Sequence, residues 1–449
     1  MKLFTFSRGG IHPEENKLSH EVATVAAELP ELAVYPLWQH IGAPAKPVVK
    51  RGDKVKVGTL IAEAGGFVSA PIFSSVSGTV SKIDTIIDAT GYRQPAIFIK
   101  TEGDEWEESI DRSEQLETMA SHPELTPEEI INRVKAAGIT GMGGAGFPTF
   151  IKLMPPPTAK AECIIINAVE CEPYITSDYR IMMEHADEII VGVQLLMKSV
   201  HVDKAYIGIE NNKPRAIELM TERAAVDSRI KVVALAQKYP QGGEKQLVDA
   251  VIGREVPAPP AIPVNVGAIP VNVGTAFAVY QAVMKNKPLF ERYTTVTGKN
   301  IKHPGNFLVR MGTSFGQLID ACGGMPEGDN KVLAGGPMMG KAVMNLDVPV
   351  CKGTNSVTVL TGDDAHRKAI QPCIRCAKCV AVCPMGLEPY LIATLSSLHK
   401  YERLEREDVT SCISCGSCQY TCPAHRPLLD NIVQGKGAVM GIIKARQKK

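Results

Sequence analysis

The sequence lacks the features that mark several common classes of protein. Lysine plus arginine (49) nearly balance aspartate plus glutamate (48), so the net charge is +1 and no basic excess points to nucleic acid. The first residues contain no apolar run of secretory type, so we expect no cleaved leader. No Ser/His/Asp or Cys/His constellation stands out. These absences argue against nucleic-acid binding, secretion and hydrolytic catalysis.

Residues 256–284 carry no charge and are long enough to raise the question of a membrane span. Five prolines interrupt this stretch, and each would break a helix: Pro257, Pro259, Pro260, Pro263 and Pro270. We therefore predict a buried loop that leads into a helix near residues 275–285. No transmembrane segment is expected anywhere in the chain.

Eight of the twelve cysteines form two copies of one pattern, C-x2-C-x2-C-x3-C followed by proline. Bacterial 4Fe–4S proteins use this run, and its fourth cysteine ligates the other run's cluster. The pattern predicts two 4Fe–4S clusters, one on Cys373, Cys376, Cys379 and Cys422, and one on Cys412, Cys415, Cys418 and Cys383. Zinc and disulfides are the alternatives, but neither run has a histidine at a ligand position and no leader directs the chain to an oxidising compartment. Reduced cysteines and iron–sulfur ligation together predict a cytoplasmic protein.

Turn residues and hydrophobic periodicity divide the chain into segments. Residues 51–58 and 77–80 resemble the two halves of a lipoyl-type barrel-sandwich. Phe67 lies where the acceptor lysine would be, so we expect a structural or docking module. Strands near 162–167, 204–210 and 230–236 alternate with helices near 178–199 and 213–225, which predicts a Rossmann-like α/β domain with a parallel sheet. The predicted segments are a lead-in with a short helix around 20–29 (1–33), the barrel-sandwich (34–105), the α/β domain (118–290), a β-grasp module (291–362), a helical two-cluster ferredoxin-type domain (366–430) and a basic tail (431–449).

Residues 141–146 form a glycine-rich loop, Gly-Met-Gly-Gly-Ala-Gly. Glycines allow backbone N–H groups to approach a phosphate closely. The loop follows a predicted helix, so it is not the dinucleotide fingerprint, and no Gly-Lys-Ser/Thr follows, so it is not a P-loop. A tight turn is the simplest alternative. An iron–sulfur protein that exchanges electrons with a hydride donor needs a converter, and flavin is the usual one. The loop therefore predicts a binding site for a flavin phosphate.

Four stretches resemble motifs of the NADH-oxidising, FMN-binding subunit of respiratory complex I: residues 138–152, 167–173, 239–247 and 271–275. The resemblance implies FMN as cofactor and NAD(H) as substrate, with Glu172 as the catalytic residue near the nicotinamide and Phe147 stacked on NAD(H). The implied cofactor-binding residues are Gly141, Gly143, Gly144, Gly146, Phe147, Lys152, Asn167, Glu170, Tyr239, Gly242, Gly243, Glu244 and Asn272.

The chain departs from the complex I pattern at Met142, Pro155, Val169 and Gly243, and these changes concern the NAD-binding part of the site more than the flavin. A tandem repeat, residues 261–267 and 268–274, leaves open whether Asn265 or Asn272 has the asparagine role.

The order of the segments, opening with Arg-Gly-Gly-Ile-His-Pro at residues 8–13 and including an SLBB-type β-grasp module, resembles the RnfC family of Rnf-complex proteins. The resemblance implies a peripheral NADH/FMN and iron–sulfur subunit on the cytoplasmic face of the cell membrane. Its implied partners are the other Rnf subunits, namely the iron–sulfur B subunit and the integral membrane subunits, with ferredoxin reached indirectly. The implied activity is that of an NAD-linked oxidoreductase whose electron transfer drives Na+ or H+ translocation. Two alternatives are a microcompartment-type cobalamin reductase and an electron-wire subunit with a degenerate NAD site.

Overall fold

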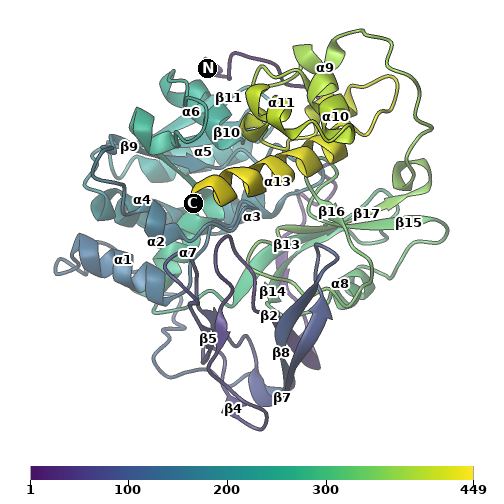
Figure 1. Ribbon diagram of the computed structural model, residues 1–449. Helices are drawn as coiled ribbons and strands as arrows, with labels where there is room; N and C mark the ends of the chain where they lie inside the picture. The colour runs from purple at the N-terminus through teal and green to yellow at the C-terminus, as the bar shows by residue number, and fades with distance from the viewer. Residues whose placement is uncertain (1, 448–449) are drawn as a thin grey trace.

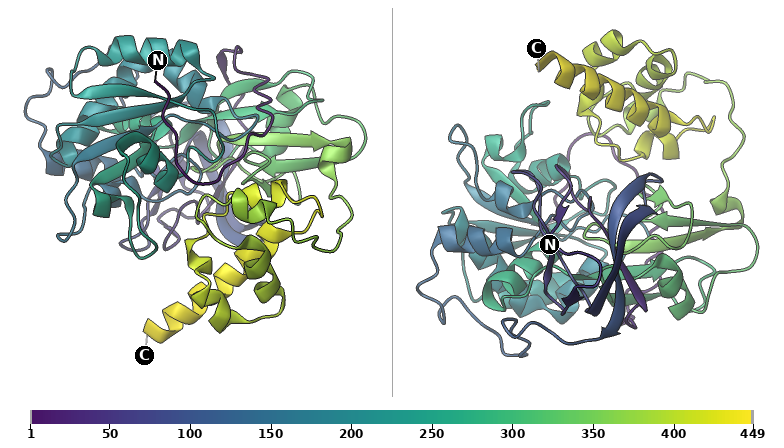
Figure 2. Two further views of the ribbon diagram at one scale, coloured as in Figure 1. Left: turned by 90° about the horizontal axis from the view of Figure 1, so that it is seen from above. Right: turned by 60° about the horizontal axis from the view of Figure 1, so that its bottom comes forward.

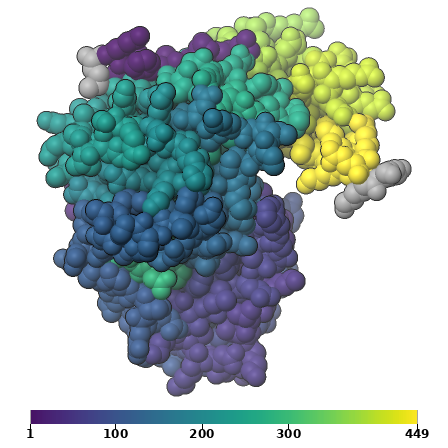
Figure 3. Space-filling view, turned by 90° about the vertical axis from the view of Figure 1, so that its left-hand side faces the viewer, coloured from purple at the N-terminus to yellow at the C-terminus, as the bar shows by residue number. Residues whose placement is uncertain are grey.

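The computed structural model describes residues 2–447. Four modules pack together, and the helical cluster domain projects from one corner of the body, with the barrel-sandwich at the opposite end (Figures 1 and 3). The N-terminal segment runs along the α/β domain to the edge of the cluster domain (Figure 2, left). Among residues 2–447, no helix combines the length and apolar composition needed to cross a bilayer.

The barrel-sandwich has two antiparallel sheets, with strand orders β2-β8-β7-β4 and β3-β5-β6. Their inner faces bury Tyr35, Ile61, Val80 and Ile97, and the Tyr35 hydroxyl shares a hydrogen bond of 2.8 Å with Ser75 Oγ. The strands are β2 (Leu32–Pro36), β3 (Lys46–Pro47), β4 (Lys54–Val55), β5 (Leu60–Glu63), β6 (Ile72–Phe73), β7 (Ser77–Ile87) and β8 (Arg93–Gly103). The predicted barrel-sandwich fold is confirmed.

The α/β domain is built on a four-stranded parallel sheet in the order β11-β10-β9-β12. Successive residues of β9 point to opposite faces of the sheet. Ile164 and Ile166 pack towards α4 and α7, while Ile165 packs towards α6. The strands are β9 (Cys163–Asn167), β10 (Ala205–Glu210), β11 (Ile230–Leu235) and β12 (Ala268–Asn272). The helices are α1 (Pro127–Ala136), α2 (Thr149–Lys152), α3 (Ser177–Glu184), α4 (Ala186–Ser199), α5 (Pro214–Ala224), α6 (Glu244–Ile252), the 3-10 helix η1 (Pro263–Val266) and α7 (Val273–Met284).

Two predictions about this domain were wrong. Residues 268–272 form a strand and not a loop, and Pro270 is accommodated because β12 is an edge strand, where a missing N–H costs no ladder bond on the open side. The helix predicted over 178–199 is divided at His185, whose backbone is not helical (φ −136°, ψ 38°). At that position the imidazole stacks on Phe277 and binds the Tyr293 hydroxyl at 2.6 Å.

The β-grasp module forms most of a six-stranded sheet in the order β1-β14-β13-β17-β15-β16. Its elements are β13 (Glu291–Thr297), β14 (Gly305–Arg310), α8 (Phe315–Ala321), β15 (Asn330–Ala334), β16 (Lys341–Ala342), β17 (Ser356–Thr361) and η2 (Gly362–Ala365). The edge strand β1 (Thr24–Ala26) comes from the lead-in and pairs in parallel with β14. The short helix predicted around residues 20–29 was therefore wrong, because pairing with a distant sheet edge outweighs a weak local preference.

The cluster domain consists of short helices and one long helix around two loops. They are α9 (Lys378–Ala381), α10 (Pro389–Ser397), α11 (Tyr401–Arg406), η3 (Val409–Ser411), α12 (Ser417–Tyr420) and α13 (Leu428–Gln447). Residues 431–447, predicted as a loose basic tail, belong to α13, which packs on α10 and α11 through Ile432 and Val439. Lys436 Nζ donates to the Cys412 carbonyl at 2.6 Å. Lys448 and Lys449 lie outside the described residues.

Candidate functional site

The glycine loop after α1 is a tight turn that presents bare backbone. Gly141 N–H donates to the Phe147 carbonyl at 2.8 Å, while Gly144 and Gly146 have φ of +110° and +65°, which favour glycine. A methyl group added to Gly144 would meet no atom within 4 Å. The N–H groups of Gly143, Gly144 and Ala145 have no acceptor among residues 2–447. Free donors on an open glycine turn fit an anionic or carbonyl-rich ligand such as a flavin nucleotide.

Two asparagines lie beside this loop at the carboxyl ends of neighbouring strands. Asn167 ends β9, Asn272 ends β12, and the two residues are partners in the sheet register. A methyl group on Gly143 would lie 3.5 Å from Asn272 Cβ. By contrast, Asn265 lies in η1, where its side chain accepts from Ile262 N–H at 2.8 Å. Of the two repeat copies, Asn272 is thus the one beside the glycine loop.

The third motif follows β11 and reaches the same place. Asn167 Nδ2 donates to the Gly242 carbonyl at 2.8 Å, and a methyl group on Gly242 would lie 3.6 Å from Asn167 Oδ1. Lys152 forms an ion pair with Glu244 and also donates to the Pro270 carbonyl at 3.0 Å. The fold therefore gathers at one sheet end most of the residues predicted to hold a cofactor. Their roles towards it stay predictions.

The two acidic residues of the second motif accept hydrogen bonds from backbone N–H groups of other segments. Glu170 Oε1 accepts from Asp178 N–H at 2.7 Å, while its buried Oε2 has no partner among the described residues, and burial raises the pKa of this carboxyl. Glu172 Oε1 accepts from the N–H groups of Met338 (2.6 Å) and Met339 (3.2 Å) in the β-grasp module. Burial raises the pKa of Glu172 to about 7. Its predicted role at the nicotinamide stays a prediction, and so does the stacking role of the half-buried Phe147.

Three charged residues support these motifs and were missed from the sequence: the half-buried Lys17 and Asp178 and the buried Arg292. Lys17 Nζ donates to the carbonyls of Glu170, Glu172 and Ile175 at 2.7 to 2.9 Å. Asp178 accepts from Asn272 Nδ2 at 2.7 Å, and the Arg292 guanidinium donates to the Met142 carbonyl at 3.3 Å. Each is a single charged residue far from its partner in sequence, and no local pattern could have identified it.

Met142 is the loop residue at which the chain departs from the complex I pattern. Its side chain is 5% exposed and belongs to the main hydrophobic core. Its N–H donates to Thr275 Oγ1 at 2.9 Å, which ties the loop to the first turn of α7. Met142 therefore fixes the glycine loop to the hydrophobic core and to α7.

The two cysteine runs fold into the same loop twice. Arg375 and Ala377 in the first run have φ of +56° and +57°, and their counterparts Ser414 and Gly416 have φ of +57° and +79°. Each run then continues into one helical turn, α9 or α12. The two runs therefore share one backbone conformation, as expected for two loops that bind the same kind of cluster.

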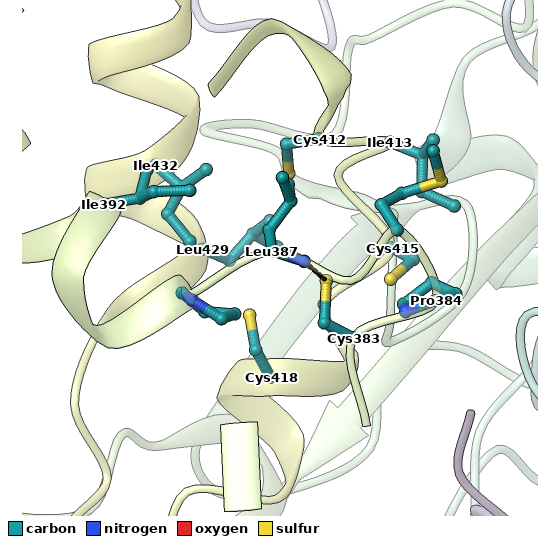
Figure 4. Close-up of a pocket in the computed structure, with 13 residues that line it drawn as sticks. Cys383, Pro384, Leu387, Ile392, Cys412, Ile413, Cys415, Cys418, Leu429 and Ile432 are labelled. Carbon is teal, nitrogen blue, oxygen red and sulfur yellow. Dashed lines mark hydrogen bonds between the residues drawn. The ribbon is translucent and has the colours of Figure 1, made fainter. Parts of the chain in front are cut away.

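One pocket in the cluster domain is lined by cysteines of both runs (Figure 4). Cys383 of the first run lies among Cys412, Cys415 and Cys418 of the second, with Leu387, Ile392 and Ile432 around them. Cys383, Cys415 and Cys418 are buried. Thiolate donors around an apolar pocket suit a 4Fe–4S cluster. The first run differs, because Cys373 and Cys376 lie in a segment, residues 366–378, that is exposed throughout.

The flavin-type motifs and the inner cysteine pocket meet directly. The Tyr239 hydroxyl donates to the Cys415 carbonyl at 2.7 Å, and Tyr239 is 2% exposed. Tyr239, Met338, Cys415 and Ile11 form one apolar cluster, to which four parts of the chain contribute. Tyr239 was predicted to bind a cofactor, and its hydroxyl contacts the cluster domain.

Comparison with known protein families agrees with this architecture. The RnfC Barrel sandwich hybrid domain matches residues 4–104, the Nuo51 FMN-binding domain 134–281, the SLBB domain 293–342 and the 4Fe-4S dicluster domain 367–430. A solved structure of an NAD+-reducing NiFe-hydrogenase, 21% identical, aligns over 70% of this chain and 62% of that chain with a TM-score of 0.49. The family matches and the site define an iron–sulfur protein with an FMN-binding domain of the Nuo51 type.

Three relatives of known type identify the family within this class. The C subunit of the proton-translocating ferredoxin:NAD(+) oxidoreductase complex of Clostridium ljungdahlii is 44% identical over 89% of this chain and 86% of that protein. The C subunit of the Na(+)-translocating complex of Acetobacterium woodii is 42% identical over 96% of this chain and 97% of that protein. The C subunit of the ion-translocating oxidoreductase complex of Rhodobacter capsulatus is 42% identical over 85% of this chain and 73% of that protein. The chain belongs to the RnfC family, whose members are subunits of the Rnf ion-translocating oxidoreductase complex.

Proposed function

We propose that this chain is the subunit through which an Rnf-type ferredoxin:NAD+ oxidoreductase complex exchanges electrons with NAD(H), while other subunits translocate Na+ or H+. The proposal rests on family membership together with one structural observation. The third motif of the FMN-binding domain begins at Tyr239, and Tyr239 donates a hydrogen bond to the backbone of Cys415. This contact supports the proposal that a hydride-accepting site and a one-electron site lie next to each other in one chain.

FMN, when bound, supplies the conversion between a two-electron hydride and single electrons. The chain's contribution is to hold and orient it. Gly143, Gly144 and Ala145 offer three consecutive N–H donors, and Lys152, fixed by Glu244 and the Pro270 carbonyl, provides a positive charge nearby. We propose that these groups bind the flavin nucleotide at the ends of β9 and β12.

We propose the crossed assignment for the clusters. Cys383 with Cys412, Cys415 and Cys418 forms the inner site, next to Tyr239. Cys422 completes the outer site with Cys373, Cys376 and Cys379. The outer site is the one that partner subunits can reach, because residues 366–378 are exposed. This segment carries Arg367, Lys368, Arg375 and Lys378, which favours an acidic partner surface.

The proposed partners are the iron–sulfur B subunit and the integral membrane subunits of the complex, with ferredoxin reached through them. We propose a peripheral position at the cytoplasmic face of the membrane. The relatives from Clostridium ljungdahlii and Acetobacterium woodii belong to complexes that translocate protons or Na+. We assign that translocation step to the integral membrane subunits, since an ion path through a bilayer must be enclosed by membrane-spanning elements.

An anaerobic titration tests the proposal. The purified, reconstituted chain is titrated with NADH while flavin and cluster absorbance are followed, and iron and FMN are quantified on the same sample. We expect one FMN and about eight iron atoms per chain, both reduced by NADH. If dithionite bleaches the flavin but NADH does not, the chain is an electron-wire subunit and direct oxidation of NADH is wrong.

A further inference from the structure

The N-terminal strap, residues 4–11, joins the α/β domain along one open edge of its sheet. Phe4 N–H donates to the Ala234 carbonyl at 3.1 Å, and Ala236 N–H donates to the Phe4 carbonyl at 2.8 Å. Further along, Ile11 and Tyr239 exchange both backbone hydrogen bonds, each 2.9 Å long. The strap thus lies along the edge strand β11 and the loop after it (Figure 2, left).

The middle of the strap contacts the cluster domain through bare backbone. Gly10 N–H donates to the Val382 carbonyl at 2.9 Å. A methyl group on Gly9 would lie 2.7 Å from the carbonyl carbon and oxygen of Cys383, a contact that side chains do not make. Gly9 also has φ of +67°. Only glycine lets the strap come this close to the backbone of a proposed cluster ligand.

These contacts connect two cysteines of the proposed inner cluster through the strap. They lead from Cys383 through Gly9, Gly10 and Ile11 to Tyr239, whose hydroxyl donates to the Cys415 carbonyl. Cys383 and Cys415 line the same pocket. Three residues beyond Tyr239, the Gly242 carbonyl accepts from Asn167 at the proposed flavin site. Residues 239–242 therefore contact both the proposed inner cluster site, at Cys415, and the proposed flavin site, at Asn167.

Arg8 adds a charge at the same place. A methyl group on Gly386 would lie 2.5 Å from Arg8 Nη1, so the guanidinium lies over the loop that follows Cys383. Arg8 lines a cavity with Pro384 and Met385, and the other charged residues of that cavity are Lys245, Asp249 and Glu255. A cation near a cluster favours the reduced state, because reduction adds negative charge.

We propose that residues 8–11 are positioning residues for electron transfer. They hold the cluster of Cys383, Cys412, Cys415 and Cys418 against the loop that contains Tyr239, and Arg8 raises the reduction potential of this cluster. This inference rests on the proposed function, since it requires FMN and the crossed cluster assignment.

Glycine variants of the full-length, reconstituted chain test the geometry. Gly9→Ala is compared with Gly253→Ala, because Gly253 has the same φ of +67° and a methyl group there would meet no atom within 4 Å. Gly9→Ala is expected to alter or eliminate only the inner cluster, with iron falling up to about twofold from about eight atoms. FMN content stays at the wild-type level, and Gly253→Ala keeps both clusters.

Arg8 variants test the charge and remain informative if Gly9→Ala does not fold. Redox titration followed by electron paramagnetic resonance is expected to give a lower midpoint potential for one cluster in Arg8→Gln, with Arg8→Lys close to wild type. A purely structural strap would leave both potentials unchanged in Arg8→Gln, and that result overturns the role of Arg8. Equal iron content and spectra in Gly9→Ala and Gly253→Ala overturn the positioning role. If the wild-type chain itself lacks FMN or a second cluster, the proposed function fails instead.

Discussion

Replacing Cys422 with serine tests how the two cysteine runs share their clusters. Cys422 belongs to the second run by sequence, yet the pocket that holds Cys412, Cys415 and Cys418 is completed by Cys383 of the first run. With four thiolates already around this pocket, Cys422 is left for Cys373, Cys376 and Cys379. Cys422→Ser should therefore damage the outer cluster and spare the inner one.

The size of the effect follows from the ligand count. Each 4Fe–4S cluster contains about four iron atoms and takes four ligands, so loss of one cluster lowers iron from about eight to about four atoms per chain. Charge-transfer absorbance should fall by about half for the same reason. FMN content should be unchanged, because the predicted flavin residues lie in a different module.

The identity of the lost cluster is read by matching spectra between variants. Cys376→Ser provides the reference for loss of the outer cluster, and Cys415→Ser the reference for loss of the inner one. Cys422→Ser should reproduce the resonance spectrum of Cys376→Ser, and Cys383→Ser that of Cys415→Ser. Cys322→Ser is the matched control, since Cys322 is a buried free thiol in the β-grasp core and should keep all the iron. A Cys422→Ser spectrum that matches Cys415→Ser would refute the crossed assignment.

Three further predictions concern the loop and two buried titratable residues. Gly143→Val brings a branched side chain against Asn272, where even a methyl group lies 3.5 Å from Cβ, so FMN released by acid should fall severalfold while iron stays constant. Burial raises the pKa of Glu172 from 4.5 to about 7, so the folded state holds its proton more tightly, and stability present at low pH is lost as pH rises from about 4.5 to about 7. Chemical denaturation should show this decline, at most about 1.4 kcal/mol per pH unit, weakened in Glu172→Gln. Burial lowers the pKa of Lys352 from 10.5 to about 7, so wild-type stability should rise with pH above about 7, and Lys352→Met should remove that rise in the same assay.

Local sequence patterns were sufficient to predict several strands of the α/β domain and the loops of the cluster domain. The βαβ alternation identified β9, β10 and β11, and the spacing of the cysteines identified the cluster loops. Resemblance to a known family supplied the motif residues that the fold brings to the ends of β9 and β12.

Features that depend on contacts between residues far apart in the sequence could not be predicted from local patterns. Pro270 argues against a strand unless the strand lies at a sheet edge, and edge position is a property of the assembled sheet. Glu172 lies in a motif that suggests catalysis, yet its carboxylate binds two N–H groups of the β-grasp module, 166 and 167 residues away. Lys17 and Arg292 are single charged residues whose hydrogen bonds to Glu170 and Met142 form only when distant segments pack.

The N-terminal strap also has a consequence for how the chain is made. Residues 4–11 are synthesised long before their partners, since Thr5 binds Gln241, 236 residues later, and Gly10 pairs with Val382, later still. The strap therefore cannot form these contacts until most of the chain has been synthesised. Contacts of such long sequence separation also form slowly. Docking of the strap is a late step of folding that brings it against the backbone of Val382 and Cys383. We expect iron–sulfur cluster insertion into this protein to be coupled to completion of the whole chain, with no stage at which the cluster domain matures alone.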